Sequence, residues 1–172
     1  HEQFLPAIRS GMEIWKDEKQ VEGLLFNYKH FYGSYDYIGD SRKWYRKEIR
    51  IVRKNKTIRS YKDAQGFRHT DNTKLKVKPI AANVYHYGWV RPPSLMKLKT
   101  KALDTIHHGS AASNLERNKE AVQFSYGNMK KMAEFKESHP AVMEERIKLF
   151  DWEDDLDYEG NKNSNHPPHK HE

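Results

Sequence analysis

The residue of this sequence best placed to act as a proton acceptor is Asp63. It is one of only three acids among residues 41–101, a segment that also holds 18 Lys and Arg. Positive neighbours favour the charged form of a carboxyl group, so Arg59, Lys62 and Arg68 should keep Asp63 ionised. An ionised carboxylate suits the role of a general base. The competing interpretation is that Asp63 caps a turn or pairs with a neighbouring arginine.

The tyrosine-rich stretch 31–40, with the sequence FYGSYDYIGD, offers a second kind of chemistry. Aromatic faces such as those of Tyr32 and Tyr35 can cover the apolar face of a pyranose. The carboxylates of Asp36 and Asp40 can accept hydrogen bonds from its hydroxyls. The composition therefore fits sugar recognition, and the alternative is that the tyrosines simply close the edge of a sheet.

A histidine and two arginines complete the candidate residues. His86 lies at the end of a predicted strand, and imidazole is a suitable ligand for Mn²⁺ beside carboxylates. Arg46 and Arg50 alternate along another predicted strand, so both could reach a diphosphate or a phosphorylated acceptor. The alternatives are a hydrogen-bonded core histidine and a solvated or ion-paired face of arginines.

The composition limits the classes of site that this protein can contain. It has no cysteine, which excludes disulfides, thiolate metal sites and a cysteine nucleophile. The net charge of +7 combines a middle of 18 − 3 = +15 with flanks of −3 and −5. Such a middle attracts phosphate-bearing partners. No apolar run approaches the roughly 18 residues needed to cross a bilayer, which predicts a protein without a transmembrane segment.

Periodicity predicts the elements that must position these residues. Phe4, Ile8, Met12 and Trp15 recur at helical spacing, and the apolar run 21–30 is typical of a buried strand. Further strands are expected at 43–53, at 57–61 after a turn, and over 75–90, whereas 31–40 is expected to be a loop. Helices are predicted from Ser94 onward and over 140–150. This order indicates a mixed α/β fold.

Four motifs in a fixed order suggest a family. They are HFYGSYD at 30–36, WYRKEIR at 44–50, SYKDAQGFR at 60–68 and VYHYGWVRPP at 84–93. In this order they resemble a group of bacterial family 2 glycosyltransferases. The resemblance extends from about His1 to the HPAVM segment at 139–143, which is most of the chain.

The resemblance implies a partial GT-A fold, with a mixed sheet over about 21–90 flanked by an N-terminal helix and C-terminal helices. Residues 1–108 would be the C-terminal half of the GT-A domain, 109–150 a helical extension, and 151–172 a poorly ordered acidic tail rich in His and Pro. The nucleotide-binding half, with its metal-binding acids, would lie before His1.

The resemblance also implies an activity, namely inverting transfer of a sugar from a nucleotide-sugar to a saccharide or lipid-linked acceptor. It implies a divalent cation, Mn²⁺ or Mg²⁺, and a cytoplasmic location that allows peripheral contact with the inner face of the membrane. In this assignment Asp63 is the catalytic base and His86 a metal ligand. The expected substrate-binding residues are Tyr32, Tyr35, Asp36, Arg46, Arg50, Gln65 and Trp89.

Two alternatives remain open at the level of the sequence. The basic middle interleaves Tyr, Trp and Phe with Lys and Arg, which is also typical of a nucleic-acid-binding module without catalytic activity. The motifs of the common RNA- and DNA-binding folds are absent, however. The other alternative is a non-catalytic fragment that folds or docks with a missing half.

Overall fold

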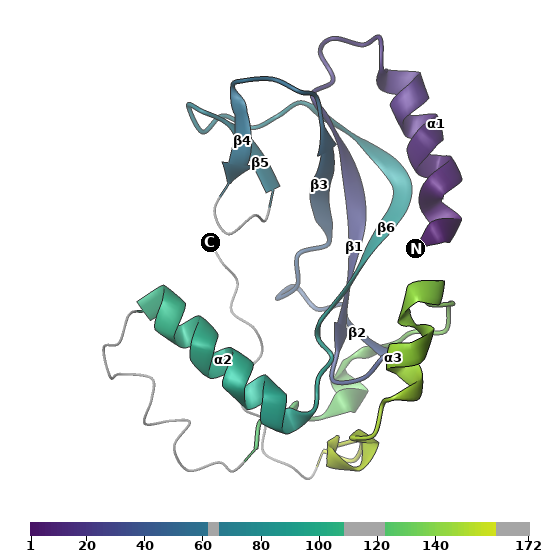
Figure 1. Cartoon of the computed structure of the whole chain (residues 1–172), viewed down its shortest axis with the longest axis vertical. Helices are drawn as coiled ribbons and strands as arrows, with labels where there is room; N and C mark the ends of the chain where they lie inside the picture. The colour runs from purple at the N-terminus through teal and green to yellow at the C-terminus, as the bar shows by residue number, and fades with distance from the viewer. Residues whose placement is uncertain (62–65, 109–122, 161–172) are drawn as a thin grey trace. The chain divides into compact units, whose positions relative to one another are not determined.

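The computed structural model describes residues 1–61, 66–108 and 123–160, and shows a mixed α/β protein with antiparallel strand pairs (Figure 1). The chain order of its elements, where η denotes a 3-10 helix, is η1 (Glu2–Phe4), α1 (Leu5–Trp15), β1 (Gly23–Tyr32), β2 (Tyr37–Gly39), β3 (Lys47–Val52), β4 (Ile58–Tyr61), β5 (Gly66–His69), β6 (Val77–Trp89), α2 (Pro93–His108), η2 (Met129–Lys131), β7 (Ala133–Glu134), η3 (Ala141–Met143), α3 (Glu144–Lys148) and η4 (Glu153–Asp155).

The chain divides into two compact units. Unit 1 comprises His1–Lys29, Tyr45–His86 and His139–Val142, and unit 2 comprises His30–Trp44, Tyr87–Ser138 and Met143–Glu172. Strands β1 and β6 each contribute residues to both units. The division therefore interleaves along the sequence instead of cutting it into consecutive segments.

The larger sheet is built around β1. In unit 1, β1 pairs antiparallel with β3 over Gly23–Asn27, with an irregularity in register between Leu24 and Leu25. In unit 2, the end of β1 pairs with β2, with His30 opposite Gly39, and β2 pairs in turn with β7. Strand β6 also pairs with β1.

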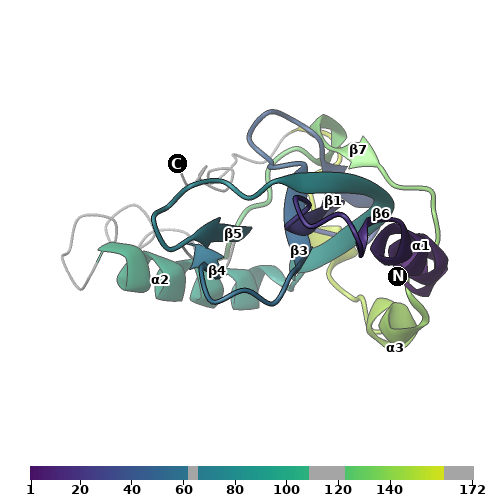
Figure 2. The same ribbon diagram turned by 90° about the horizontal axis from the view of Figure 1, so that it is seen from above.

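Strands β4 and β5 form a separate two-stranded sheet (Figure 2). In it, Ile58 lies opposite His69 and Tyr61 opposite Gly66. The strand expected at 57–61 is present as β4. It does not pair with the preceding strand β3 across the turn, but with β5, the next strand in the chain.

The core of unit 1 lies between α1 and the sheet. Leu24, Phe26 and Ala82 are buried there, and Phe4 and Ile8 of the N-terminal helical segment pack against them, with Trp15, Ile51, Ile80 and Val84 at the periphery. Figures 1 and 2 both place α1 beside β6. Full burial of an apolar side chain of this size contributes about 1.5–3 kcal/mol, and the partly buried Phe4, Ile8 and Trp15 each contribute less while together holding the helical segment on the sheet.

The core of unit 2 is mainly aromatic. Phe31 is fully enclosed, and its ring stacks on Tyr87 at 4.5 Å and meets Phe135 edge-on at 4.8 Å. The indole Nε1 of Trp152 donates a hydrogen bond to the carbonyl of Gly33 at 2.9 Å. Residues 151–160, which the sequence assigned to the tail, therefore contribute a buried aromatic side chain, and residues 161–172 lie outside the described part.

Elements of the C-terminal segment are short. The predicted helix over 140–150 is present as η3 followed by the five-residue α3, and the 109–122 part of the predicted helical extension lies outside the described residues. Within residues 1–61, 66–108 and 123–160, no helix is both long enough and apolar enough to cross a membrane.

Candidate functional site

A buried carboxylate on β3 is the most unusual titratable group in the described part of unit 1. The side chain of Glu48 is only 1% exposed, and its Oε2 lies 2.7 Å from Nη2 of Arg50, two residues along the same strand. That contact has the distance of an ion pair but not the alignment of a hydrogen bond. Desolvation raises the pKa of Glu48 to about 7, although Arg50 opposes the rise. Glu48 can therefore change its charge near neutral pH.

The Tyr28 ring lies beside Arg50 of this ion pair and adjoins two further aromatic rings. The Tyr28 ring on β1 lies 4.9 Å from the Tyr45 ring and 5.7 Å from the His86 ring on β6. The Arg50 guanidinium carbon lies 5.8 Å from the centre of the Tyr28 ring, and its Nη2 is 3.5 Å from the Tyr28 hydroxyl. We refer to Tyr28, Tyr45, Glu48, Arg50 and His86 as the Glu48 cluster.

Parts of the Glu48 cluster reach solvent. Tyr45 is 43% exposed and the Arg50 side chain is 40% exposed, whereas Glu48 is enclosed. Desolvation, followed by the hydrogen bond with Tyr28, raises the pKa of Tyr45, so its phenol remains a neutral donor. The cluster therefore presents the uncharged ring of Tyr45 to solvent beside the guanidinium of Arg50. The enclosed carboxylate of Glu48 holds that guanidinium in position.

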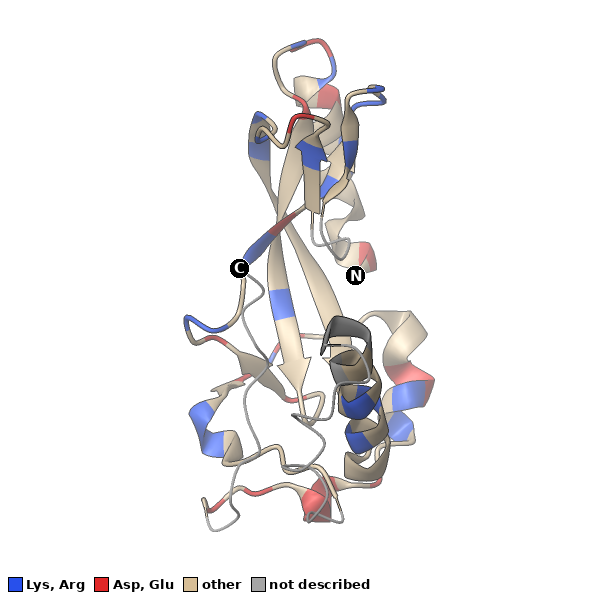
Figure 3. Ribbon diagram, turned by 90° about the vertical axis from the view of Figure 1, so that its left-hand side faces the viewer, with Lys and Arg blue, Asp and Glu red and all other residues tan. Residues whose placement is uncertain are grey.

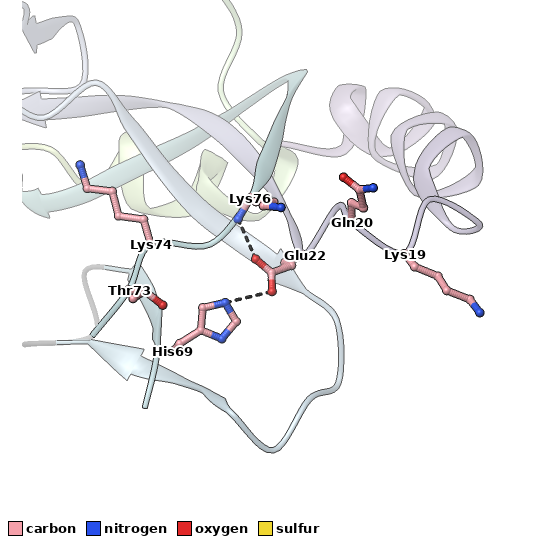
Figure 4. A pocket seen from close by; sticks show the side chains of 7 residues that line it. All are labelled: Lys19, Gln20, Glu22, His69, Thr73, Lys74 and Lys76. Atoms are coloured by element: carbon pink, nitrogen blue, oxygen red, sulfur yellow. Dashed lines mark hydrogen bonds and ion pairs between the residues drawn. The ribbon is translucent and has the colours of Figure 1, made fainter. Parts of the chain in front are cut away.

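A second polar arrangement in unit 1 joins the start of β1 to the end of β5 (Figure 4). Glu22 accepts a hydrogen bond from Nε2 of His69 at Oε1, with a distance of 2.9 Å, and another from the backbone N–H of Lys76 at Oε2, at 2.8 Å. The backbone hydrogen bond first, and then His69, lower the pKa of Glu22. These residues line a hollow of about 270 Å³.

The structure brings some of the sequence-predicted site residues together. Arg50 and His86 both contact the Tyr28 ring in the Glu48 cluster. Arg46 is exposed just before β3, and its carbonyl accepts a hydrogen bond from the Tyr28 N–H at 2.8 Å. Asp63 and Gln65, in contrast, lie outside the described residues.

The remaining predicted residues belong to unit 2. Tyr32 and Tyr35 are only 2% and 7% exposed. The Tyr32 ring lies 6.2 Å from the ring of Trp89, which is half-buried and carries the Lys99 ammonium 4.6 Å from its ring centre. Asp36 is exposed. In this chain, the two tyrosines thus contribute to packing, and Asp36 and Trp89 are the members of this group that solvent reaches.

Sequence reasoning did not single out three of the polar residues that the structure emphasises. Glu48 could have been noticed as a lone acid among the alternating basic residues of WYRKEIR, but nothing in that motif indicates its burial. Glu22 and His69 are 69 − 22 = 47 positions apart and belong to no motif, so no signal in the sequence predicts their contact.

The resemblance implies a divalent cation, which needs several His or carboxylate side chains close together. Among them, no group of three His or carboxylate side chains is arranged to hold a metal ion. The ring of His86, the predicted ligand, lies 5.7 Å from the Tyr28 ring. The described residues therefore do not by themselves make a cation site.

Comparison with known proteins gives no further assignment: no family model, no curated protein and no solved structure matches this chain.

Proposed function

We propose that this chain is the acceptor-side portion of a nucleotide-sugar-dependent glycosyltransferase of the GT-A type, which binds a saccharide or lipid-linked acceptor. The observation that carries the proposal is the Glu48 cluster. There the Tyr28 ring adjoins the Tyr45 ring, the His86 ring and the guanidinium of Arg50, which is paired with Glu48. The motif resemblance supports the same function independently.

In this proposal, Tyr45 stacks on the apolar face of an acceptor sugar, and Arg50 donates hydrogen bonds to its hydroxyl or phosphate oxygens. Glu48 is a positioning residue, because it is enclosed and acts on the acceptor only through Arg50. Its ionised form holds the guanidinium in place, which reduces the entropy lost on binding.

The proton of the attacking hydroxyl would be accepted by Asp63, the assignment that the resemblance supports. A bound Mn²⁺ or Mg²⁺ would stabilise the charge of the departing diphosphate. Because the described residues do not form a cation site, no step of the proposal is assigned to His86 as a ligand.

The experiment is a binding measurement with the full chain. Oligosaccharides are screened on a glycan array, and those that bind are titrated by NMR. We expect Tyr45→Ala and Arg50→Gln each to weaken binding by about tenfold or more, as expected for loss of a contact of roughly 1.4 kcal/mol. Arg59→Gln, which removes an exposed arginine on β4, is the matched control and should leave the affinity unchanged. Absence of glycan binding, or equal losses in all three variants, contradicts the proposal.

The alternative is a nucleic-acid-binding module, and one observation on the β4–β5 hairpin favours it. The guanidinium of Arg68 lies 4.9 Å from the centre of the Tyr61 ring, an arrangement that can extend to a stacked base. Under this alternative, single-stranded oligonucleotides bind with an affinity that falls steeply with salt, and nucleotide-sugars with Mn²⁺ have no effect.

A further inference from the structure

Helix α2 carries apolar side chains on two different faces. Pro93 and Met96 are buried in unit 2. Leu95 and Leu98, in contrast, are 49% and 63% exposed, and Ala102 is exposed as well. Residues that are three, four and seven positions apart lie on the same face of a helix. Leu95, Leu98 and Ala102 therefore form one outward-facing row, which we call the α2 stripe.

The α2 stripe differs from other exposed apolar residues because its members adjoin one another. Leu149 is more exposed, at 74%, but it is the only exposed large apolar residue within 143–160. On α1, Leu5 and Met12 are two turns apart, and the exposed Arg9 lies between them in the sequence. Single exposed apolar side chains are ordinary, whereas adjoining ones indicate an interaction surface. The α2 stripe is therefore the candidate for such a surface in unit 2.

Positive charge borders the α2 stripe. Lys97 and Lys101 lie one turn apart along one flank of the stripe, and Lys101 is exposed. Arg91, just before the helix, is exposed as well. Residues 93–103 contain three lysines and no acid, and the lysines of α2 appear as blue bands in Figure 3. Within the described ranges, no ion pair involves Arg91 or Lys101, so their charge is open to an anionic partner.

The helix that presents this surface is fixed to the end of β6. Nζ of Lys99 donates a hydrogen bond to the carbonyl of Gly88 at 2.5 Å and lies 4.6 Å from the centre of the Trp89 ring. The hydroxyl of Tyr126 donates to the carbonyl of Arg91 at 2.7 Å, which holds the residues just before the helix. Lys99 is thus used by the fold, whereas the α2 stripe takes no part in these contacts.

We propose that the α2 stripe docks on the surface of a membrane that contains anionic lipids. A helix that lies in a membrane surface needs one apolar face to enter the boundary of the acyl chains and lysines beside it to contact anionic headgroups. The aliphatic stem of a lysine can lie along the apolar stripe while its ammonium reaches a phosphate oxygen. The α2 stripe shares no residue with the Glu48 cluster. The inference therefore needs neither the motif resemblance nor the proposed function.

The test is sedimentation of the full chain with lipid vesicles. Vesicles of phosphatidylcholine mixed with phosphatidylserine are compared with vesicles of phosphatidylcholine alone. We expect the chain to sediment with the anionic vesicles, and less so as the salt concentration rises. Leu98→Glu should weaken this binding by about tenfold or more, because an inserted apolar group becomes a charge that the lipid repels. Leu149→Glu makes the same change at an exposed leucine outside α2, and it should leave the binding within about twofold.

A second pair of variants tests the role of charge. Lys101→Gln should weaken binding to the anionic vesicles by about fivefold, as expected for one lysine near a negative surface. Lys148→Gln makes the same change in net charge on α3, where the lysine is exposed and paired with Glu145, and should leave the binding within about twofold. Equal losses in Lys101→Gln and Lys148→Gln would indicate attraction by net charge alone and overturn the assignment to α2.

The other possible occupant of the α2 stripe is a second copy of this chain. Light scattering over a range of protein concentrations detects it. A dimer that is lost in Leu98→Glu, together with no sedimentation on anionic vesicles, overturns the proposal in favour of an interface between copies. Equal vesicle binding by Leu98→Glu and Leu149→Glu overturns it as well. Because neither measurement involves saccharides or Tyr45, failure here leaves the proposed function standing.

Discussion

At the scale of single residues, Glu48 shows how burial and pairing compete. Its carboxyl group is taken out of water beside one arginine, and the desolvation cost exceeds the attraction, since the pKa rises despite Arg50. Retaining such a group is costly for stability. The enclosed ion pair therefore does not strengthen the fold, and the proposed function gives it the task of holding Arg50 in position.

Glu48 should make the stability of the chain depend on pH in a defined direction. Because its pKa is about 7 in the folded state against 4.5 in the unfolded state, the folded chain holds more protons between these values. The free energy of unfolding therefore decreases as the pH rises through that window, by on the order of 3 kcal/mol. Urea unfolding of the unchanged chain and of Glu48→Gln at pH values across the window measures this.

The variant Glu48→Gln should lose this decrease while keeping the rest of the pH profile. In Arg50→Gln the pKa of Glu48 should rise further, because the guanidinium that opposes the rise is removed. The decrease in the free energy of unfolding should then extend to higher pH than in the unchanged chain. Identical pH profiles for Glu48→Gln and the unchanged chain would show that Glu48 does not titrate in this range.

At the scale of elements, side chains distant in the sequence fix the ends of helices and strands. Arg53, just after β3, donates to the carbonyls of Val21 and Trp15, both at 2.6 Å, and of Glu18 at 2.9 Å. Its guanidinium thereby satisfies carbonyls at and beyond the C-terminal end of α1, where positive charge is also favoured. This arginine holds the α1–β1 connection against the sheet.

Replacing Arg53 with methionine should destabilise unit 1. The change preserves much of the aliphatic stem but removes the guanidinium donor from three carbonyls, of which that of Glu18 keeps a second donor, the Val21 N–H. We expect a loss of about 2–3 kcal/mol. Lys54→Met at the neighbouring exposed position is the control. Thermal unfolding followed by circular dichroism measures both, and equal melting temperatures for the two variants would contradict the role assigned to Arg53.

Strand β2 depends on a glycine for a different reason. A Cβ placed on Gly39 would lie 2.1 Å from Cε2 of Trp44, whose ring is buried, whereas a Cβ on Gly66 would meet no atom within 4 Å. Gly39→Ala must displace the indole and should cost about 1–3 kcal/mol. Gly66→Ala should be close to neutral, and chemical denaturation compares the two. A stability loss no greater in Gly39→Ala than in Gly66→Ala would show that the indole moves without cost.

The elements that the sequence predicts well are those whose pattern is local. The spacing of Phe4, Ile8 and Trp15 identified the buried face of α1, but Met12 of the same pattern is 49% exposed. Strand β2 lies in a stretch that was predicted to be a loop. Its three residues have no strand-like pattern of their own and form a strand by pairing with β1 and β7. The enclosure of Glu48 escaped prediction for the same reason, since it depends on how β3 packs in the sheet and not on the sequence around it.

At the scale of the whole molecule, two strands are common to both units. In β1 the residues up to Lys29 belong to unit 1 and the rest to unit 2. In β6 the residues up to His86 belong to unit 1 and the rest to unit 2. The two strands also pair with each other. Each core, aliphatic in unit 1 and aromatic in unit 2, is therefore built on the same pair of strands.

The variant Phe31→Ala tests whether this sharing affects the entire chain. Removal of this fully buried ring from unit 2 should cost about 3–5 kcal/mol. We expect hydrogen exchange to accelerate at β3 and β5 of unit 1 as well as in unit 2. Acceleration confined to unit 2 would show that the units open separately.

The shared strands have a consequence for cooperativity. A unit built on its own segment of chain can unfold alone. Here both cores use β1 and β6, so unfolding of either core also disrupts strands on which the other core is built. The expected result is a single calorimetric transition whose van't Hoff and calorimetric enthalpies agree. In practical terms, no proteolytic cut within β1 or β6 should release a fragment of either unit that remains folded.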